Sequence, residues 1–392
     1  MKKIILLLLA LLPLVADAQF NGTGFYRAQN RDSYRYLVIV DDKSVGRVGT
    51  TGVDIAMLKA MKPFDKYVVS NPASVCYIEE VSKSGSTYTC NLSAQGRTLS
   101  SNNGMALKLQ STSTAKVYKL TGSKDGYSAI ISDAYDDEDD EEITDLMVAD
   151  GDRPFWNILP INGSNDCYFG IKGEVTATDG NVWSTMFASF AFKADNAANT
   201  KAYTISKVGH GYAAIKEVTD IVPKKTAVLF CCKSADAVNN KLTLYNDGGN
   251  NVGTNLLDGV YFCNDVKDNA TIKHRNVTPY DESTMRVLGL DSNGKPAFVK
   301  GTADNLVVGS KKGGEEGKLF LPANKAYLKV PAGSPDVLQI VTEEEYETLG
   351  IHDVLMDQQY DGRYYDLQGR RVDNPSHGLY IVNGRKVVVG SK

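Results

Sequence analysis

Short runs of alternating apolar and polar residues, separated by turn residues, fill most of this chain and constrain its fold most strongly. In residues 25–40 two strand-like runs, the mixed FYRAQ and the apolar YLVIV, flank the polar stretch NRDSYR. Similar strand-turn-strand segments recur to about residue 160, without the periodicity of an amphipathic helix. The pattern predicts an all-β protein whose first part is built from hairpins of similar size.

The first of these hairpins resembles a repeat of the ricin-type β-trefoil family. The residues that match its opening phrase, Y-R-x-x-N followed by Y-L, are Tyr26, Arg27, Asn30, Tyr36 and Leu37. The stretch FWNI at 155–158 resembles the aromatic end of a trefoil repeat. The resemblance implies a β-trefoil-like domain over residues 19–165.

This domain departs from the family at the phrase Q-x-W, which marks sugar-binding trefoil repeats. Pro154 stands where the glutamine would precede Trp156, so we assign Trp156 to the core. The polar loops nevertheless carry tyrosine, arginine, asparagine and aspartate, which suit hydroxyl-rich ligands and are also ordinary in β loops. The candidate ligand-binding residues are Asn30, Tyr34, Arg35 and Asp41.

An acidic stretch, DAYDDEDDEEITD at 133–145, interrupts the first domain. Carboxylates this close together repel one another, which favours a solvated loop. The alternative is a calcium site, because calcium takes oxygen ligands, but the glycine and ligand spacing of an EF-hand loop are absent. No metal ligand is therefore assigned here.

Residues 166–341 contain longer strands of alternating apolar and polar residues, and two of their segments resemble each other. Residues 202–230 and 286–330 each read as strand, glycine turn and strand, and Pro223 and Pro322 precede the last strand of each copy. We expect a β-sandwich-like region with an internal repeat. Its phrases are also similar to those of uncharacterised secreted proteins of Bacteroidetes, a likeness that implies no activity.

The six cysteines do not form a zinc motif, because no C-x-x-C pair or interleaved histidine occurs. Their pairing cannot be chosen from sequence. Cys231 and Cys232 are adjacent in a predicted strand, where neighbouring side chains face opposite sides. We expect them to pack as small apolar residues on two faces instead of bonding to each other.

The N-terminal residues predict export. Two lysines, an apolar run from Ile4 to Val15 and the A-x-A site at 16–18 form a signal peptide over residues 1–18, too short to span a membrane comfortably. We expect no transmembrane segment and a location outside the cell or on its outer surface. The formal net charge of −4 also argues against nucleic acid as a partner.

Residues 342–363 read as a short helix and linker. Thr342 and Glu345 form a capping box, acidic residues fill the first turn, and Gly350 can end the helix.

Residues 364–392 predict a small hairpin module. Asn383-Gly384 lies between two β-branched runs, a strong hairpin signal because both turn positions need positive φ. The module resembles the later half of the C-terminal sorting domain of the type IX secretion system, which implies the secretion machinery as a partner. The alternative is a hairpin that only protects a sheet edge. The main motif positions are Tyr365, Asp366, Gly369, Arg370, Gly378, Tyr380, Ile381 and Lys386.

No catalytic motif stands out. The four histidines, His210, His274, His352 and His377, lie in predicted loops or beside the connector, and no nucleophile elbow, P-loop or dinucleotide fingerprint occurs. We therefore expect no enzyme, no catalytic residue and no cofactor. The leading hypothesis is an exported surface protein that binds glycans or host or matrix proteins. A structural or adhesive component is the alternative, and a glycoside hydrolase is the third.

Overall fold

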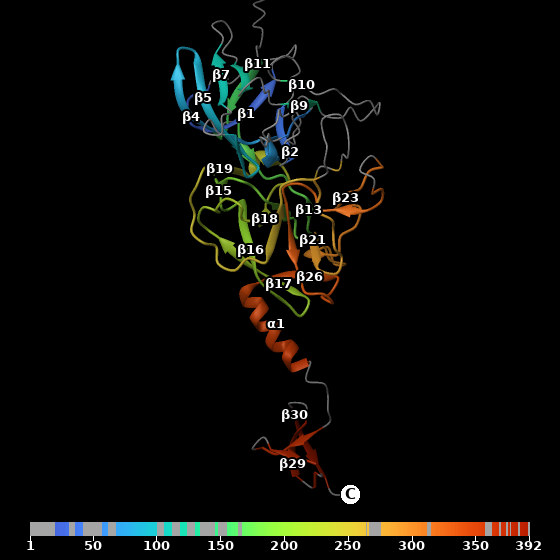
Figure 1. Cartoon of the computed structure of the whole chain (residues 1–392). Helices are drawn as coiled ribbons and strands as arrows, with labels where there is room; N and C mark the ends of the chain where they lie inside the picture. Colours follow the sequence, from blue (N-terminus) through green and yellow to red (C-terminus); the bar gives the residue numbers. More distant parts are fainter. Residues whose placement is uncertain are drawn as a thin grey trace, which may run out of the picture. The chain divides into compact units, whose positions relative to one another are not determined.

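The computed structural model divides the chain into two compact units, Met1–Ile340 and Val341–Lys392 (Figure 1). Strands dominate both units, so the all-β prediction is confirmed. Among the described residues, no helix is long and apolar enough to cross a membrane. The structure describes residues 20–30, 36–41, 57–61, 68–99, 106–111, 118–123, 130–133, 146–147, 155–163, 167–263, 265, 276–311, 315–356, 363–367, 370–373, 375–376, 378–382 and 385–390.

Six strands of the first region close into a ring in which each strand pairs antiparallel with both neighbours. The order round the ring is β1, β11, β8, β7, β5 and β4, and β4 pairs again with β1. Closure gives every ring strand two partners, so the ring itself has no open edge. The bounds are β1 Gly24–Asn30, β4 Cys76–Ser84, β5 Thr87–Ala94, β7 Ala106–Ser111, β8 Tyr118–Ser123 and β11 Phe155–Pro160.

Among the described residues, five further strands lie outside the ring, in the chain segments that connect its strands. β2 and β3 lie between β1 and β4 in the chain, β6 lies between β5 and β7, and β9 and β10 lie between β8 and β11. Two short 3₁₀ turns, η1 and η2, precede β4, and the Asn71 side chain caps η2 by accepting a hydrogen bond from the Ala73 N–H at 2.9 Å. The bounds are β2 Tyr36–Asp41, β3 Met57–Met61, η1 Val68–Ser70, η2 Pro72–Ser74, β6 Arg97–Leu99, β9 Ile130–Asp133 and β10 Leu146–Met147.

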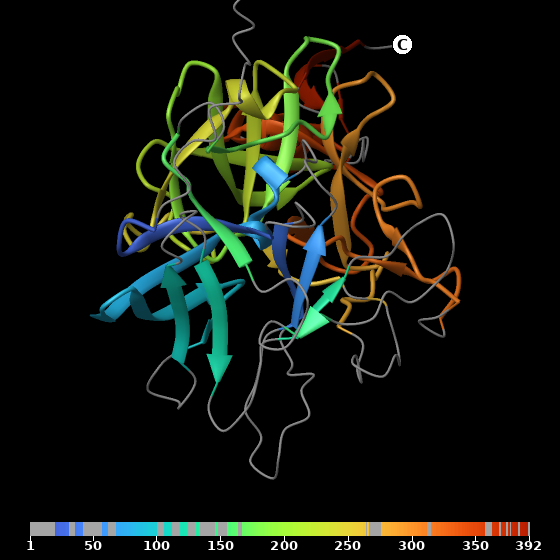
Figure 2. The same cartoon turned by 90° about the horizontal axis from the view of Figure 1, so that it is seen from above.

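The second region is built on a ten-stranded curved sheet, whose green, yellow and orange strands are seen from above in Figure 2. The order β14-β18-β16-β17 in its first half recurs as β20-β25-β21-β22 in its second half, with β26 between them and β13 beside β14. The bounds are β13 Val175–Thr176, β14 Val182–Met186, β16 Thr200–Gly209, β17 Tyr212–Val218, β18 Val228–Cys232, β20 Leu257–Val260, β21 Met285–Leu290, β22 Pro296–Val299, β25 Lys325–Lys329 and β26 Val337–Thr342.

Both faces of strands β14 and β18 are covered by apolar side chains. On one face, a three-stranded sheet of β12 (Phe169–Gly170), β19 (Lys241–Tyr245) and β15 (Ala191–Ala194) packs across a phenylalanine-rich core. On the other face, side chains from both halves of the curved sheet form a second core. Cys232 is buried in the first core, whereas Cys231 packs against the second, and the two thiols do not bond to each other. The two-face prediction for these cysteines is confirmed.

The two ends of the curved sheet meet along a line that we call the seam, where β14 lies against β25 without a hydrogen-bonded ladder. The Phe187 N–H donates to the Asn324 carbonyl at 2.9 Å, and Lys325 Nζ donates to the Thr185 carbonyl at 3.4 Å. A hairpin of β23 (Val307–Val308) and β24 (Leu319–Phe320) is described in the same unit. The seam therefore leaves space between strands that a continuous ladder would close.

In its described residues, the C-terminal unit has one helix, α1 (Glu343–Met356), and a four-stranded sheet in the order β28-β27-β29-β30. In the β29–β30 pair Val382 faces Arg385, so a two-residue connection joins the strands, as Asn383-Gly384 predicts. None of the described residues of this unit is buried. The bounds are β27 Tyr364–Tyr365, β28 Arg371–Val372, β29 Gly378–Val382 and β30 Arg385–Val389.

The helix confirms its predicted start but not its predicted end. The Glu345 N–H donates to Thr342 Oγ1 at 3.2 Å and the Thr342 N–H donates to Glu345 Oε2 at 2.8 Å, which is a complete capping box. The helix continues through Gly350 to Met356, so the predicted end was wrong. A single glycine costs about 1 kcal/mol in a helix interior, which the following IHDVLM run can offset.

We predict that the two adjacent thiols react at different rates. Burial raises the pKa of Cys232 to about 12, and Cys231 is only half-buried on the other face of β18. Because the thiolate is the reactive species, iodoacetamide at pH 8 should alkylate Cys231 well before Cys232. Tandem mass spectrometry of the native protein over time measures both sites. Equal rates would contradict the placement of Cys232 in the core, and denatured protein provides the control in which the two rates converge.

Candidate functional site

A buried arginine ties the first region to the second. Arg27 of β1 donates to Ser74 Oγ at 3.0 Å, to the Tyr168 carbonyl at 2.8 Å and to the Val69 carbonyl at 3.4 Å. Its guanidinium also lies 6.0 Å from the centre of the Phe169 ring. Burial lowers the pKa of Arg27 to about 10. The sequence phrase that contains Arg27 thus has a structural role at the junction of the two regions.

A pair of buried amides forms a second tie across the same junction. Gln95 Nε2 donates to Asn324 Oδ1 at 2.9 Å, and Asn324 Nδ2 donates to Gln95 Oε1 at 2.8 Å. The remaining amide hydrogens reach the Tyr261 and Phe187 carbonyls. Both residues have left-handed backbones, with φ of 49° and 58°, which turn their side chains toward each other from separate loops. The two regions are therefore fixed in register at this point.

A polar pocket, which we call the junction pocket, opens between the same two regions and has a volume of about 180 Å³. Tyr77 is half-buried in its wall, and its ring centre is 5.1 Å from that of Phe25. Lys224, Lys225 and Asn246 reach it from the second region, and all three are exposed. The pocket is lined by Phe25, Val75, Tyr77, Ser93, Ala94, Gly96, Ser189, Phe190, Lys224, Lys225 and Asn246.

A larger and more apolar cavity, the seam cavity, lies where the ends of the curved sheet meet and has a volume of about 370 Å³. Glu174 Oε1 accepts hydrogen bonds from the Ser184 hydroxyl at 2.6 Å and from the Thr185 N–H at 2.8 Å, and it pairs with Lys325 across the seam. The cavity is lined by Glu174, Val175, Thr185, Val287, Leu288, Asp304, Asn305, Leu306, Val307, Leu321, Pro322, Lys325, Ala326 and Tyr327.

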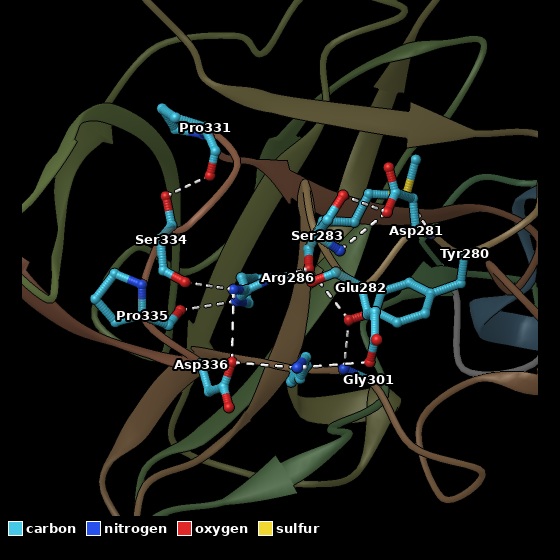
Figure 3. Close-up of polar contacts among 12 residues, drawn as sticks. Tyr280, Asp281, Glu282, Ser283, Arg286, Gly301, Pro331, Ser334, Pro335 and Asp336 are labelled. Atoms are coloured by element: carbon cyan, nitrogen blue, oxygen red, sulfur yellow. Dashed lines mark hydrogen bonds and ion pairs between the residues drawn. The ribbon is translucent and has the colours of Figure 1, made fainter.

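A polar cluster surrounds Arg286, the residue before the cavity-lining Val287 (Figure 3). The buried guanidinium of Arg286 donates to the carbonyls of Glu282, Ser334 and Pro335 at 2.7 to 2.9 Å. In the same cluster the Tyr280 hydroxyl accepts a hydrogen bond from the Gly301 N–H at 2.7 Å. This contact fixes the start of the loop that carries Asp304 and Asn305, so the cavity wall is preorganised. Arg286 itself is enclosed by carbonyls and serves the structure.

The candidate ligand-binding residues of the sequence are only partly described. Tyr34 and Arg35 lie outside the described residues, and for Asn30 and Asp41 only the backbone is described. Gln29 faces Tyr36 in the β1–β2 pair, so Asn30 and Asp41 stand toward opposite ends of β2. Their joint role stays a prediction. The pocket residues Tyr77 and Lys224 were missed, because they are distant in the chain and lack a local motif.

The structure describes only some of the residues considered for metal binding and for histidine chemistry. Among the described residues, no three His, Cys, Asp or Glu side chains gather as a metal site, and almost all of the acidic stretch lies outside them. His210 is exposed in the turn between β16 and β17, while the side chains of the other three histidines are not described.

Two residues of the C-terminal motif, Asp366 and Arg370, hold a turn together by hydrogen bonds. Arg370 Nε and its backbone N–H donate to the Asp366 carboxylate at 2.8 and 3.0 Å, and the Asp366 N–H donates to the Arg370 carbonyl at 2.9 Å. These bonds close the turn between β27 and β28. Tyr380 stacks edge-on against Tyr364, with ring centres 5.8 Å apart. Gly369 lies outside the described residues.

We predict that Gln95→Met weakens folding by about 1–3 kcal/mol, because it leaves the buried amide of Asn324 without its reciprocal partner. Asn324→Gly keeps the left-handed backbone and should cost a similar amount, and the double variant should cost less than the sum. Urea unfolding of the full chain measures each value. The exposed Asn239→Ala is the matched control and should change stability by less than about 0.5 kcal/mol. Strict additivity would show that the two amides are not coupled.

Comparison of the chain with models of known protein families, with curated proteins and with solved structures found no match.

Proposed function

We propose that this chain is an exported, non-enzymatic protein of the cell exterior that binds glycans, and that the junction pocket is its binding site. The observation that carries the proposal is the composition of that pocket. A half-buried tyrosine ring lies beside two serines, one amide and two lysines at the boundary of two rigid regions. Pockets at such boundaries, with few polar groups at fixed positions, are common ligand sites.

The chemistry of the pocket suits a saccharide. The face of the Tyr77 ring can pack against the C–H face of a sugar, while Ser93, Ser189 and Asn246 offer hydrogen bonds to hydroxyl groups. Lys224 is partly neutralised by Asp247, with Nζ 3.4 Å from Oδ2. The structure gives Lys225 no ion pair among the described residues. The excess positive charge favours saccharides that carry a carboxylate or a sulfate.

We also infer that the first region is a β-trefoil. The support is the six-stranded ring together with the strands that leave it between β1 and β4 and between β8 and β11, with the single β6 in the corresponding middle place. In the same way, the recurring strand order in the curved sheet supports the proposal that its two halves are copies of one unit. Both proposals agree with a binding protein made of rigid β modules.

For the C-terminal unit we propose recognition by the secretion machinery. Its sheet presents apolar side chains on both faces, and none of its described residues is buried. A small sheet without an interior gains little from burial and needs a partner to stabilise it. This favours a docking role over protection of a sheet edge within the chain.

A pocket variant tests the glycan proposal. Tyr77→Leu keeps an apolar side chain but removes the ring face and hydroxyl, so we expect affinity for any bound saccharide to fall about tenfold, which corresponds to roughly 1.4 kcal/mol. The full chain is assayed on a glycan array that includes acidic saccharides, and hits are measured by calorimetry. Tyr212→Leu, outside the pocket, is the matched control. If no glycan binds, the structural or adhesive role replaces the proposal, and release of reducing sugar would indicate a hydrolase.

A second variant pair tests the C-terminal unit in a host that carries a type IX secretion system. Deletion of residues 364–392 should retain the chain in the periplasm, and Tyr380→Ala should reduce its release several-fold because the ring pair with Tyr364 is lost. Val238→Ala, which truncates an exposed apolar residue of the first unit, is the control. Immunoblots of periplasm, cell surface and medium give the distribution. Normal release of the deletion variant would leave the unit without a sorting role.

A further inference from the structure

We propose that the seam cavity is a second binding site, separate from the junction pocket, and that it takes a small amphipathic cation: an apolar body with one ammonium group. The site is a cavity of about 370 Å³ in the curved sheet, within the size range of small-molecule sites. Nothing in the proposed glycan function requires this cavity.

The interior of the cavity selects an apolar body. Val287, Leu321, Ala326 and Tyr327 form its deep wall, and each is at most 7% exposed. The Tyr327 hydroxyl donates to Asp258 Oδ2 at 3.2 Å, so its ring is held in place. An apolar group that enters would remove its own surface from water against walls that are already ordered.

The rim of the cavity selects a positive charge. Glu174, Asp304 and Lys325 are its ionised side chains, which leaves one net negative charge. Oε1 of Glu174 accepts all three hydrogen bonds, from Lys325, Ser184 and Thr185. Among the described residues, no donor reaches Oε2. Asp304 is exposed and, within the same part of the chain, forms no ion pair. Two carboxylate positions are thus available to an ammonium group at the mouth.

The carboxylates are held at defined positions before any ligand arrives. Glu174 is fixed by two donors from β14, the Ser184 hydroxyl and the Thr185 N–H, and by Lys325 across the seam. The loop of Asp304 is also anchored at both ends. At its start, the Gly301 N–H donates to the Tyr280 hydroxyl, and the N–H of the next residue, Thr302, donates to Asn305 Oδ1 at 2.7 Å. Leu306, next in the chain, is buried. A preorganised rim lowers the ordering cost of binding.

The test uses the full chain and three probes of similar shape: 2-phenylethylamine, 2-phenylethanol and phenylacetate, titrated at pH 7 by calorimetry. We expect the amine to bind at least about tenfold more tightly than phenylacetate, with the alcohol between them. Asp304→Asn should weaken the amine about two- to fivefold and leave the alcohol unchanged, as a solvent-exposed charge contact would.

Adjacent residues of β23 supply a matched pair that locates the site. Val307 lines the cavity, while its neighbour Val308 points away and is 48% exposed. Val307→Trp should abolish amine binding, and Val308→Trp should retain it. Equal binding of amine and acid, absence of saturable binding, or equal effects of the two tryptophan variants would each overturn the proposal. Glycan binding by the same variants should persist, which separates failure of this site from failure of the junction pocket.

Discussion

The buried guanidinium of Arg27 is the constraint on which the first unit depends. A charge taken out of water is very costly unless hydrogen bonds replace its hydration. Among the described residues no carboxylate pairs with Arg27. Its acceptors are instead the Ser74 hydroxyl of η2, the Val69 carbonyl of η1 and the carbonyl of Tyr168, the residue before β12. These segments must all be in place together. The ring of the first region is thereby tied to the three-stranded sheet of the second, and both belong to one compact unit.

Both pockets occur where regular hydrogen bonding between strands stops. At the junction, Gln95 and Asn324 bridge two loops, and at the seam, Glu174 and Lys325 bridge two sheet ends. Side-chain bonds of this kind hold the surrounding backbone without filling the space that a strand ladder would occupy. The walls are consequently rigid while the openings remain, which is the arrangement a binding site needs.

The sequence predicted features that depend on neighbours in the chain. The capping box of α1, the hairpin connection at Val382 and Arg385, and the opposite faces of Cys231 and Cys232 all follow from local spacing. The end of α1 was missed because one glycine is a weak signal against a helix-forming run.

The pockets were beyond sequence reasoning for a physical reason. Gln95 and Asn324 are 229 residues apart, and Tyr77 and Lys224 come to line one pocket only after the two regions pack. The turn sequences AQGR and PANK contain Gln95 and Asn324, whose backbones are left-handed. They are a local signal for turns at the junction. Nothing in such a phrase identifies its partner, since many turns in a β protein have the same composition. The ricin-like phrase likewise indicated a fold, whereas its arginine contributes to packing between regions.

The absence of buried residues among those described in the C-terminal unit has a consequence for how its sequence can vary. In an ordinary domain, the interior fixes which apolar residues are tolerated, and the surface is free to drift. Here both faces of the sheet are half-exposed, so the unit itself places little demand on either face. If a partner covers one of these faces, the partner's surface decides which side chains the face tolerates. Substitutions in the unit and in the partner would then have to compensate for each other. A shared recognition surface would then preserve a short pattern of tyrosine, glycine and β-branched residues, while the rest of the chain diverges.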